Sequence, residues 1–112
     1  MSARAEARAW VLQRASAAVL AVCVIVHLVT MIVVVHAGLS AAAILGRTRG
    51  SFGWAALYGL FVVAVAVHAP LGLRTVAAEW LGWRGRSADL TWCGVGVVLL
   101  GLGARAVAAV AL

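Results

Sequence analysis

The sequence predicts an all-α membrane protein with three transmembrane helices. Of its 112 residues, 66% are hydrophobic and only 11% are charged, whereas a soluble domain has about half and about a quarter. Three apolar runs, at about residues 15–37, 52–73 and 90–112, each have roughly the 20 residues that cross the hydrocarbon core of a bilayer. This composition excludes an ordinary soluble domain, a disordered tail and a fibrous protein. It makes residues 1–112 a single transmembrane domain.

All three runs are rich in valine, which favours strands in soluble proteins. A bilayer core offers no water to an unpaired backbone group, so each run is expected to be a helix. The first run carries His27 and His36, the second carries His68, and the third is interrupted by Arg105. Such side chains are costly at membrane depth, so they are the first candidates for function.

The arginines predict how the chain crosses the membrane. The net charge is +6, and six arginines lie before the first run or after the second, against two in the loop between them. The six are Arg4, Arg8, Arg14, Arg74, Arg84 and Arg86, and the two are Arg47 and Arg49. Positively charged loops stay in the cytoplasm, so we expect a cytoplasmic N-terminus in a multi-pass protein of the bacterial inner membrane. The arginines form no basic stripe with interleaved aromatics, so the expected surroundings are lipid and not nucleic acid.

His27 lies on a small and polar face of the first predicted helix. Helical spacing places five other residues on the same face, which are Ser16, Leu20, Cys23, Thr30 and Val34. Such a face suits a helix turned toward a bundle interior, where His27 is either a ligand or a neutral core histidine bonded to a carbonyl. His36 follows nine residues later, on the other side of the helix, and is expected at the membrane surface.

His68 has small neighbours one turn away on each side, Ala64 and Gly72. A flat macrocycle bound edge-on to a helix needs small residues above and below its ligand. Pro70 removes a backbone donor nearby, and Arg74 follows in a position to hold an anionic group. The alternative is a histidine packed in the core.

Two neutral imidazoles inside a helical bundle are the usual ligands of haem b. Ligation by two histidines leaves no open position on the iron, which suits electron transfer. The two haem propionates need cationic partners in lipid, and Arg14, Arg74 and Arg105 are available. Arg105 has an alternative, because its side chain could instead reach the membrane surface.

Two segments carry motifs of a known family. In residues 11–28, Q-R-x-[ST] is followed by a histidine thirteen residues after the arginine, and residues 67–82 contain H-x-x-x-G-[IL]-[RW]. The matching residues are Gln13, Arg14, Ser16 and His27 in the first segment and His68, Gly72, Leu73 and Arg74 in the second. With an arginine in the last helix, the chain resembles the cytochrome b membrane anchors of succinate dehydrogenases and quinol:fumarate reductases.

The resemblance implies that His27 and His68 ligate haem iron, with Arg14, Ser16, Gly72, Arg74 and Arg105 around the haem or the quinone. The chain would pass electrons between an iron–sulphur subunit and membrane quinone, its substrate. A flavoprotein would perform the dicarboxylate chemistry, so this chain would be a non-dicarboxylate electron-transfer subunit.

The chain resembles only one half of the di-haem members of this family, in which five helices supply four histidines. Two haems would therefore need a second anchor chain. We expect a homodimer with two haems, and a heterodimer with a related anchor remains open. Ala15, Ala17 and Glu79 depart from the usual family residues and weaken the transfer of quinone-site detail.

Two other functions compete with this interpretation. A small oligomeric transporter would need an ionisable residue near the centre of the first span, and no glutamate is there. A cofactor-free membrane assembly protein would show no haem spectrum.

Overall fold

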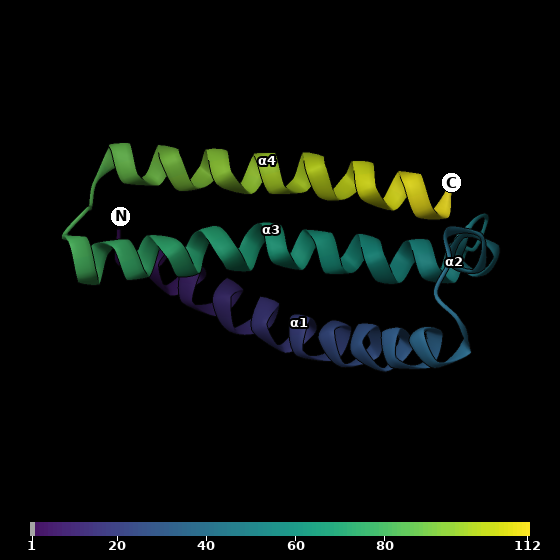
Figure 1. Cartoon of the computed structure of the whole chain (residues 1–112). Helices are drawn as coiled ribbons and strands as arrows, with labels where there is room; N and C mark the ends of the chain where they lie inside the picture. Colours follow the sequence, from purple (N-terminus) through teal and green to yellow (C-terminus); the bar gives the residue numbers. More distant parts are fainter. Residues whose placement is uncertain (1) are drawn as a thin grey trace.

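A computed structural model describes residues 2–112 and consists of four helices in this part of the chain (Figure 1). The helices are α1 (Ala3–Ala37), α2 (Ala41–Thr48), α3 (Phe52–Leu81) and α4 (Arg86–Ala111). Three of them, α1, α3 and α4, are long and apolar enough to cross a membrane. This confirms the prediction of an all-α protein with three transmembrane helices.

The central helix of the bundle is α3, which packs against α1 on one side and α4 on the other (Figure 1). The chain is elongated, with extents of 49 × 24 × 22 Å. One end of the bundle holds the start of α1 and the connection between α3 and α4, and we call it the N-terminal end. The opposite end holds α2 and the last turn of α4, and we call it the α2 end.

Three of the four helices, α1, α2 and α3, begin at serines, whereas α4 begins after Gly85 without a side-chain cap. Ser2, Ser40 and Ser51 each accept a hydrogen bond from the backbone N–H three residues later, which satisfies a free donor of the first turn. Gly82 follows α3 in the left-handed region, with φ of 67°, a conformation that suits glycine. Pro70 lies inside α3, and the helix continues through it. One missing backbone hydrogen bond therefore does not end this helix.

Small residues form the contacts between the helices. The buried apolar residues are Cys23, Val34, Ala64, Ala77, Ala88 and Ala111. At the α3–α4 contact, a Cβ atom on Gly96 would lie 3.0 Å from the carbonyl oxygen of Ala66, and one on Gly103 would collide with Val62. Close approach through small residues is typical of helices in lipid, where large apolar side chains can face outward.

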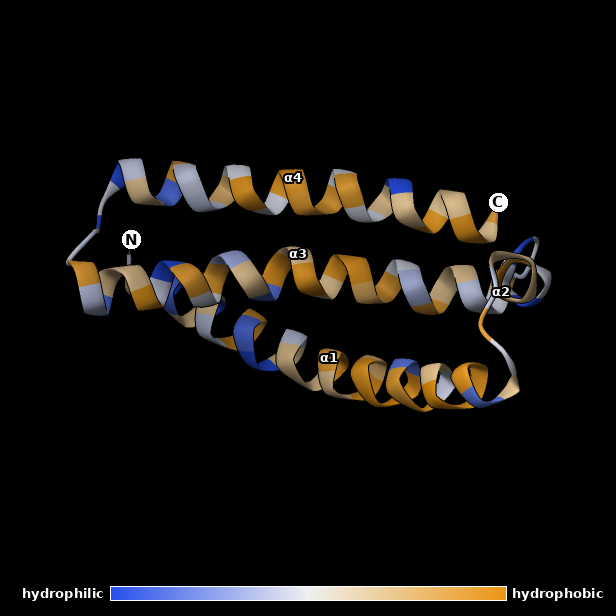
Figure 2. Ribbon diagram, in the orientation of Figure 1, coloured by the Kyte–Doolittle hydropathy of each residue, from blue (hydrophilic) through white to orange (hydrophobic). Residues whose placement is uncertain are grey.

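The distribution of hydropathy follows the predicted membrane spans. Figure 2 shows hydrophobic residues along most of α3 and along the half of α1 nearer to α2. Hydrophilic residues gather in the other half of α1 and at the connection between α3 and α4. The buried residues of α1, which are Ser16, Cys23 and Val34, all lie on the face predicted to turn inward.

The sequence analysis did not predict α2, which lies in the first loop. Its last residue, Thr48, donates a hydrogen bond to the carbonyl oxygen of Val110 at 2.6 Å. Next to it, the backbone N–H of Gly50 donates to the carbonyl oxygen of Ala111 at 2.8 Å. These bonds satisfy carbonyl groups in the last turn of α4, so α2 fastens the end of that helix to the first loop.

Candidate functional site

Ser16 and His68 meet at the contact between α1 and α3, toward the N-terminal end. The Ser16 hydroxyl lies 3.2 Å from Nδ1 of His68 and donates to the carbonyl oxygen of Gln13 at 3.1 Å. With its one proton donated to the Gln13 carbonyl, the Ser16 hydroxyl accepts a hydrogen bond from His68 only in the tautomer that carries Nδ1–H. That tautomer has the imidazole lone pair on Nε2, where it can bind a metal.

This pattern is the one that metal-ligating histidines use. Their second ring nitrogen usually donates to a nearby oxygen, which fixes both the tautomer and the orientation of the ring. Ser16 is itself buried, with 7% of its surface exposed, so water does not compete strongly for the bond. The structure thus brings together two residues that the sequence analysis selected, and their hydrogen bond holds the His68 ring in position.

The neighbour of Gly72 in the structure is the Gln13 side chain, whereas the sequence analysis expected a flat macrocycle beside it. A Cβ atom at this position would lie 3.1 Å from Nε2 of Gln13, so the Gln13 side chain occupies the space beside Gly72. The other end of that amide, Oε1, is buried and has no hydrogen-bond partner in the described structure. A flexible side chain can move aside, so Gly72 still permits a flat group to approach His68.

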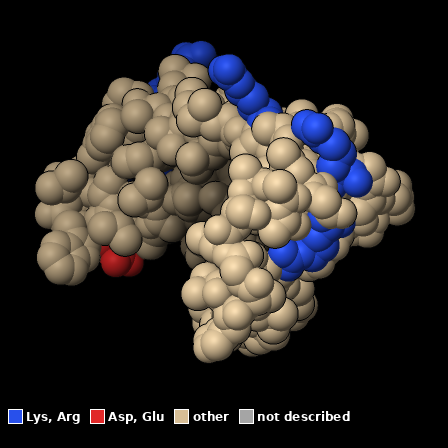
Figure 3. All heavy atoms as spheres, turned by 45° about the vertical axis from the view of Figure 1, so that its right-hand side comes forward, with Lys and Arg blue, Asp and Glu red and all other residues tan. Residues whose placement is uncertain are grey.

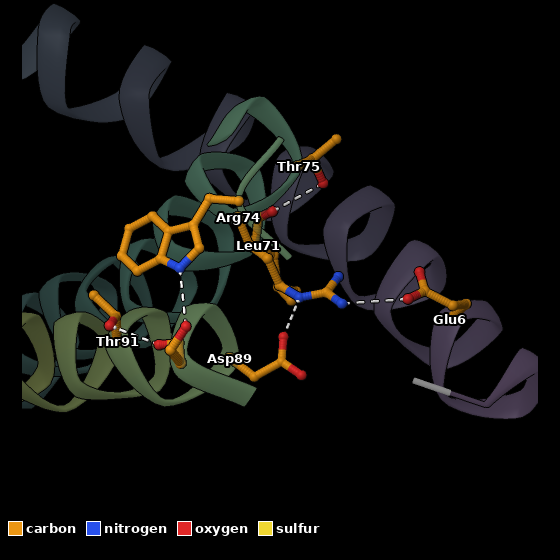
Figure 4. A network of polar contacts seen from close by, with 8 residues as sticks. Glu6, Leu71, Arg74, Thr75, Asp89 and Thr91 are labelled. Atoms are coloured by element: carbon orange, nitrogen blue, oxygen red, sulfur yellow. Dashed lines mark hydrogen bonds and ion pairs between the residues drawn. The ribbon is translucent and has the colours of Figure 1, made fainter. Parts of the chain in front are cut away.

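Arg74 forms ion pairs with two carboxylates of its own chain. Its Nε donates to Oδ1 of Asp89 at 2.7 Å, and its Nη2 lies 3.3 Å from Oε1 of Glu6. Figure 4 shows the guanidinium between the two carboxylates, which come from α4 and α1. The cluster joins all three long helices at the N-terminal end. The sequence analysis missed both partners, although each lies in the first turn or two of its helix.

The other two arginines selected from the sequence lie on the surface of the chain. The guanidinium carbon of Arg14 is 5.1 Å from the centre of the Trp10 ring, within the range of a cation–π contact. Arg105 is exposed on α4. The structure therefore does not bring Arg14, Arg74 and Arg105 together around one site.

His27 lies among aromatic side chains of α3. Its ring packs edge-to-face against Tyr58 and Phe61, with centroid distances of 6.0 and 5.9 Å. Nδ1 of His27 is buried and has no hydrogen-bond partner in the described structure. A buried polar atom without a partner is costly, so this imidazole is a candidate functional group.

A cavity of about 580 Å³ lies beside His27 at the α2 end, with walls from all four helices. Most of the wall is apolar, and the polar side chains on it are His27, Thr30, Arg47, Thr48 and Tyr58. Figure 3, which turns the α2 end forward, shows a hollow in the tan surface with arginine side chains nearby. The sequence analysis missed Arg47 and Tyr58, because nothing in their spacing links them to His27.

The two histidines lie at different levels of the bundle. His68 is at the level of Ser16, and His27 is eleven residues farther along α1. That separation is about 17 Å at the rise of an α-helix. The two imidazoles of one chain therefore cannot bind opposite sides of one iron. Each level supplies one imidazole.

A family model described as the succinate dehydrogenase/fumarate reductase transmembrane subunit matches residues 1–103. No match was found among curated proteins or among solved structures. The matched region includes α1, α2, α3, both histidine levels and most of α4. The chain therefore belongs to the succinate dehydrogenase/fumarate reductase transmembrane subunit family.

Proposed function

We propose that this chain is the haem b anchor that carries electrons between an iron–sulphur subunit and membrane quinone. The observation that carries the proposal is the Ser16–His68 hydrogen bond, which leaves Nε2 of His68 free for a metal. Membership in the family supplies the context, a membrane anchor associated with the catalytic subunits of its complex. The flavoprotein of that complex would oxidise or reduce the dicarboxylate, so this chain handles electrons only.

The residues present suit haem better than a bare metal ion. Residues 2–112 contain no group of three or more His, Cys, Asp or Glu side chains that could hold an ion. A porphyrin brings four nitrogen ligands of its own, so it needs only axial imidazoles from protein. The iron, once bound, supplies one-electron redox chemistry. His68 and His27 would each hold one iron, at separate levels of the bundle.

The missing second imidazole at each level argues for a second anchor chain. In a two-fold pair, each histidine meets its equal at equal depth, so His68 would face the partner's His68 and His27 the partner's His27. Two chains would then hold two haems stacked across the bilayer. We propose the homodimer, and a related anchor chain would satisfy the same geometry. A closed two-fold contact is the commonest form of association for small chains.

The chain is proposed to have its N-terminal end in the cytoplasm of a bacterial cell, because six arginines flank that end against two in the first loop. The His68 haem would then be nearer to the iron–sulphur subunit. Gln13, whose buried Oε1 has no partner among the described residues, and Arg14 lie at the same end. We propose that they contact the quinone or the propionates of a haem shared with the second chain.

The test is the absorption spectrum of the purified, detergent-solubilised anchor. Wild-type protein should show sharp reduced α and Soret bands, and His68→Ala should remove one haem while the chain still inserts. His36→Ala is the matched control, because His36 is exposed and its Nδ1 lies 2.8 Å from a carbonyl oxygen of its own helix. An unchanged haem-to-protein ratio in His68→Ala would reject the ligation. A wild-type protein without haem bands would instead favour a cofactor-free membrane protein.

A further inference from the structure

The acidic side chains of the chain are concentrated at one end. Its acidic side chains are Glu6, Glu79 and Asp89, and all of them lie on parts of α1, α3 and α4 at the N-terminal end. At the α2 end there are arginines but no acidic side chain. Any anion that these arginines hold must therefore come from outside this set of side chains.

Arg47 differs from the other arginines of the α2 end. It lines the cavity and is half-buried, whereas Arg49 and Arg105 are exposed. The ion pairs found in residues 2–112 both belong to Arg74, so Arg47 has no carboxylate partner in the described structure. A guanidinium beside an apolar cavity is costly without an anion, and it cannot lose its proton.

The cavity wall also carries features that suit a flat aromatic ligand. His27 lines the cavity with its imidazole ring, and Tyr58 and Phe61 contact that ring. An imidazole, aromatic walls and one guanidinium together fit a flat aromatic metal complex with carboxylate groups. Haem b has this chemistry.

We infer that Arg47 binds the carboxylates of the haem held by His27. The inference rests on the proposed function and extends it, because it adds Arg47 to the arginines that the sequence analysis offered as partners of the propionates. Arg105 interrupts an apolar run and so attracts attention in the sequence, but it does not line the cavity. Arg47 lies in α2, whose contact with the end of α4 brings it to the cavity wall.

The experiment is an optical redox titration of the purified anchor dimer, with His27→Ala used to identify the haem at this level. Arg47→Gln should lower the midpoint potential of that haem and weaken its retention. Loss of a nearby positive charge favours the oxidised, more positive iron. Arg47→Lys should keep the potential nearer to wild type but lose part of the retention, because an ammonium lacks the planar fork. Arg49→Gln is the matched control, with the same charge change two residues away on an exposed side chain.

Three results would overturn the inference. In the first, Arg47→Gln and Arg49→Gln have the same midpoint potentials and the same haem retention, which would show that Arg47 does not contact the haem. A larger shift in Arg105→Gln than in Arg47→Gln would return the role to Arg105. If His27→Ala leaves both haems in place, then His27 does not ligate a haem, and the inference about Arg47 is rejected with it. The proposed ligation by His68 does not depend on this result. Arg47→Lys keeps the test valid if Arg47→Gln does not fold.

Discussion

The two ends of the bundle differ in whether their polar groups have partners within the chain. At the N-terminal end, Arg74 binds Asp89 and Glu6, and Ser16 holds His68, so polar groups from three helices satisfy one another. At the α2 end, the buried Nδ1 of His27 has no partner among the described residues, and the His27 residue lines a cavity of about 580 Å³. The polar groups of the N-terminal end are therefore satisfied within the chain. The α2 end has an unsatisfied polar group and a cavity that a ligand could fill.

This difference shows that two histidines of the same bundle can be held in different ways, one by a hydrogen bond and the other by aromatic contacts. The ring of His68 is held by a hydrogen bond, so its geometry exists before any ligand binds. The ring of His27 is held by aromatic contacts only, and its ordering depends more on what fills the cavity. We expect changes at the N-terminal end to weaken ligation directly, and changes at the α2 end to act through the cavity.

The largest effect should come from closing the cavity. Gly103→Leu puts a side chain where even a Cβ atom would collide with Val62, so α3 and α4 must separate or rearrange. Overpacking of this kind costs about 1–3 kcal/mol. The midpoint of thermal unfolding in detergent should fall, and binding at the His27 level should be lost before binding at the His68 level. Gly101→Leu is the control, because a Cβ atom there meets nothing within 4 Å. Equal midpoints for the two variants would contradict this account of the α3–α4 contact.

A smaller but more specific effect is expected from Ser16→Ala. The substitution removes the acceptor for Nδ1–H of His68 and so releases both the tautomer and the ring orientation. Loss of such a partner typically weakens metal binding by about 10- to 100-fold. Haem retention at the His68 level should fall during a dilution series, with little change at the His27 level. Thr75→Ala is a suitable control, because this exposed hydroxyl bonds only to the Leu71 carbonyl of its own helix. Identical retention in the two variants would show that Ser16 does not position His68.

Asp89→Asn should destabilise the N-terminal end moderately. It removes the shorter of the two ion pairs of Arg74, although both partners are partly exposed, with side-chain exposures of 22% and 39%. A pair of this kind contributes up to about 1 kcal/mol to the free energy of unfolding. The loss should shrink at high salt, since exposed charges are screened. Glu79→Gln changes the same charge at a residue that forms no ion pair within residues 2–112, and it should have little effect. If Glu79→Gln lowers the free energy of unfolding as much as Asp89→Asn does, the change in net charge and not the loss of the ion pair explains the destabilisation.

The smallest effect should be local to the α2 end. Thr48→Val keeps the shape of the side chain but removes the 2.6 Å hydrogen bond to the Val110 carbonyl. The cost is about 0.5–1.5 kcal/mol, and it falls on the attachment of α2 to α4. Hydrogen exchange should quicken in α2 and the last turn of α4 and stay unchanged in the first half of α1. The control is Thr30→Val, whose hydroxyl bonds within its own helix. Uniform exchange changes along the chain would contradict a local fastening.

The sequence by itself determined the features that depend on local composition. Length and hydropathy were sufficient to predict three spanning helices, because a bilayer leaves an apolar run no other way to satisfy its backbone. Helical spacing was sufficient to predict the buried face of α1, on which Ser16, Cys23 and Val34 lie. Short motifs identified the family, which the match over residues 1–103 confirmed.

Only the tertiary structure decided which polar groups meet. The pairing of Arg74 with Asp89, the contact of Gln13 with Gly72 and the place of Arg47 on the cavity wall all depend on how the helices rotate and slide against one another. Those offsets are set by close packing at small residues such as Gly103 and by the fastening of α2 to α4. A pattern within one helix carries no information about its rotation relative to a neighbour. For this reason the sequence pattern drew attention to Arg105, whereas in the structure Arg47 lines the cavity.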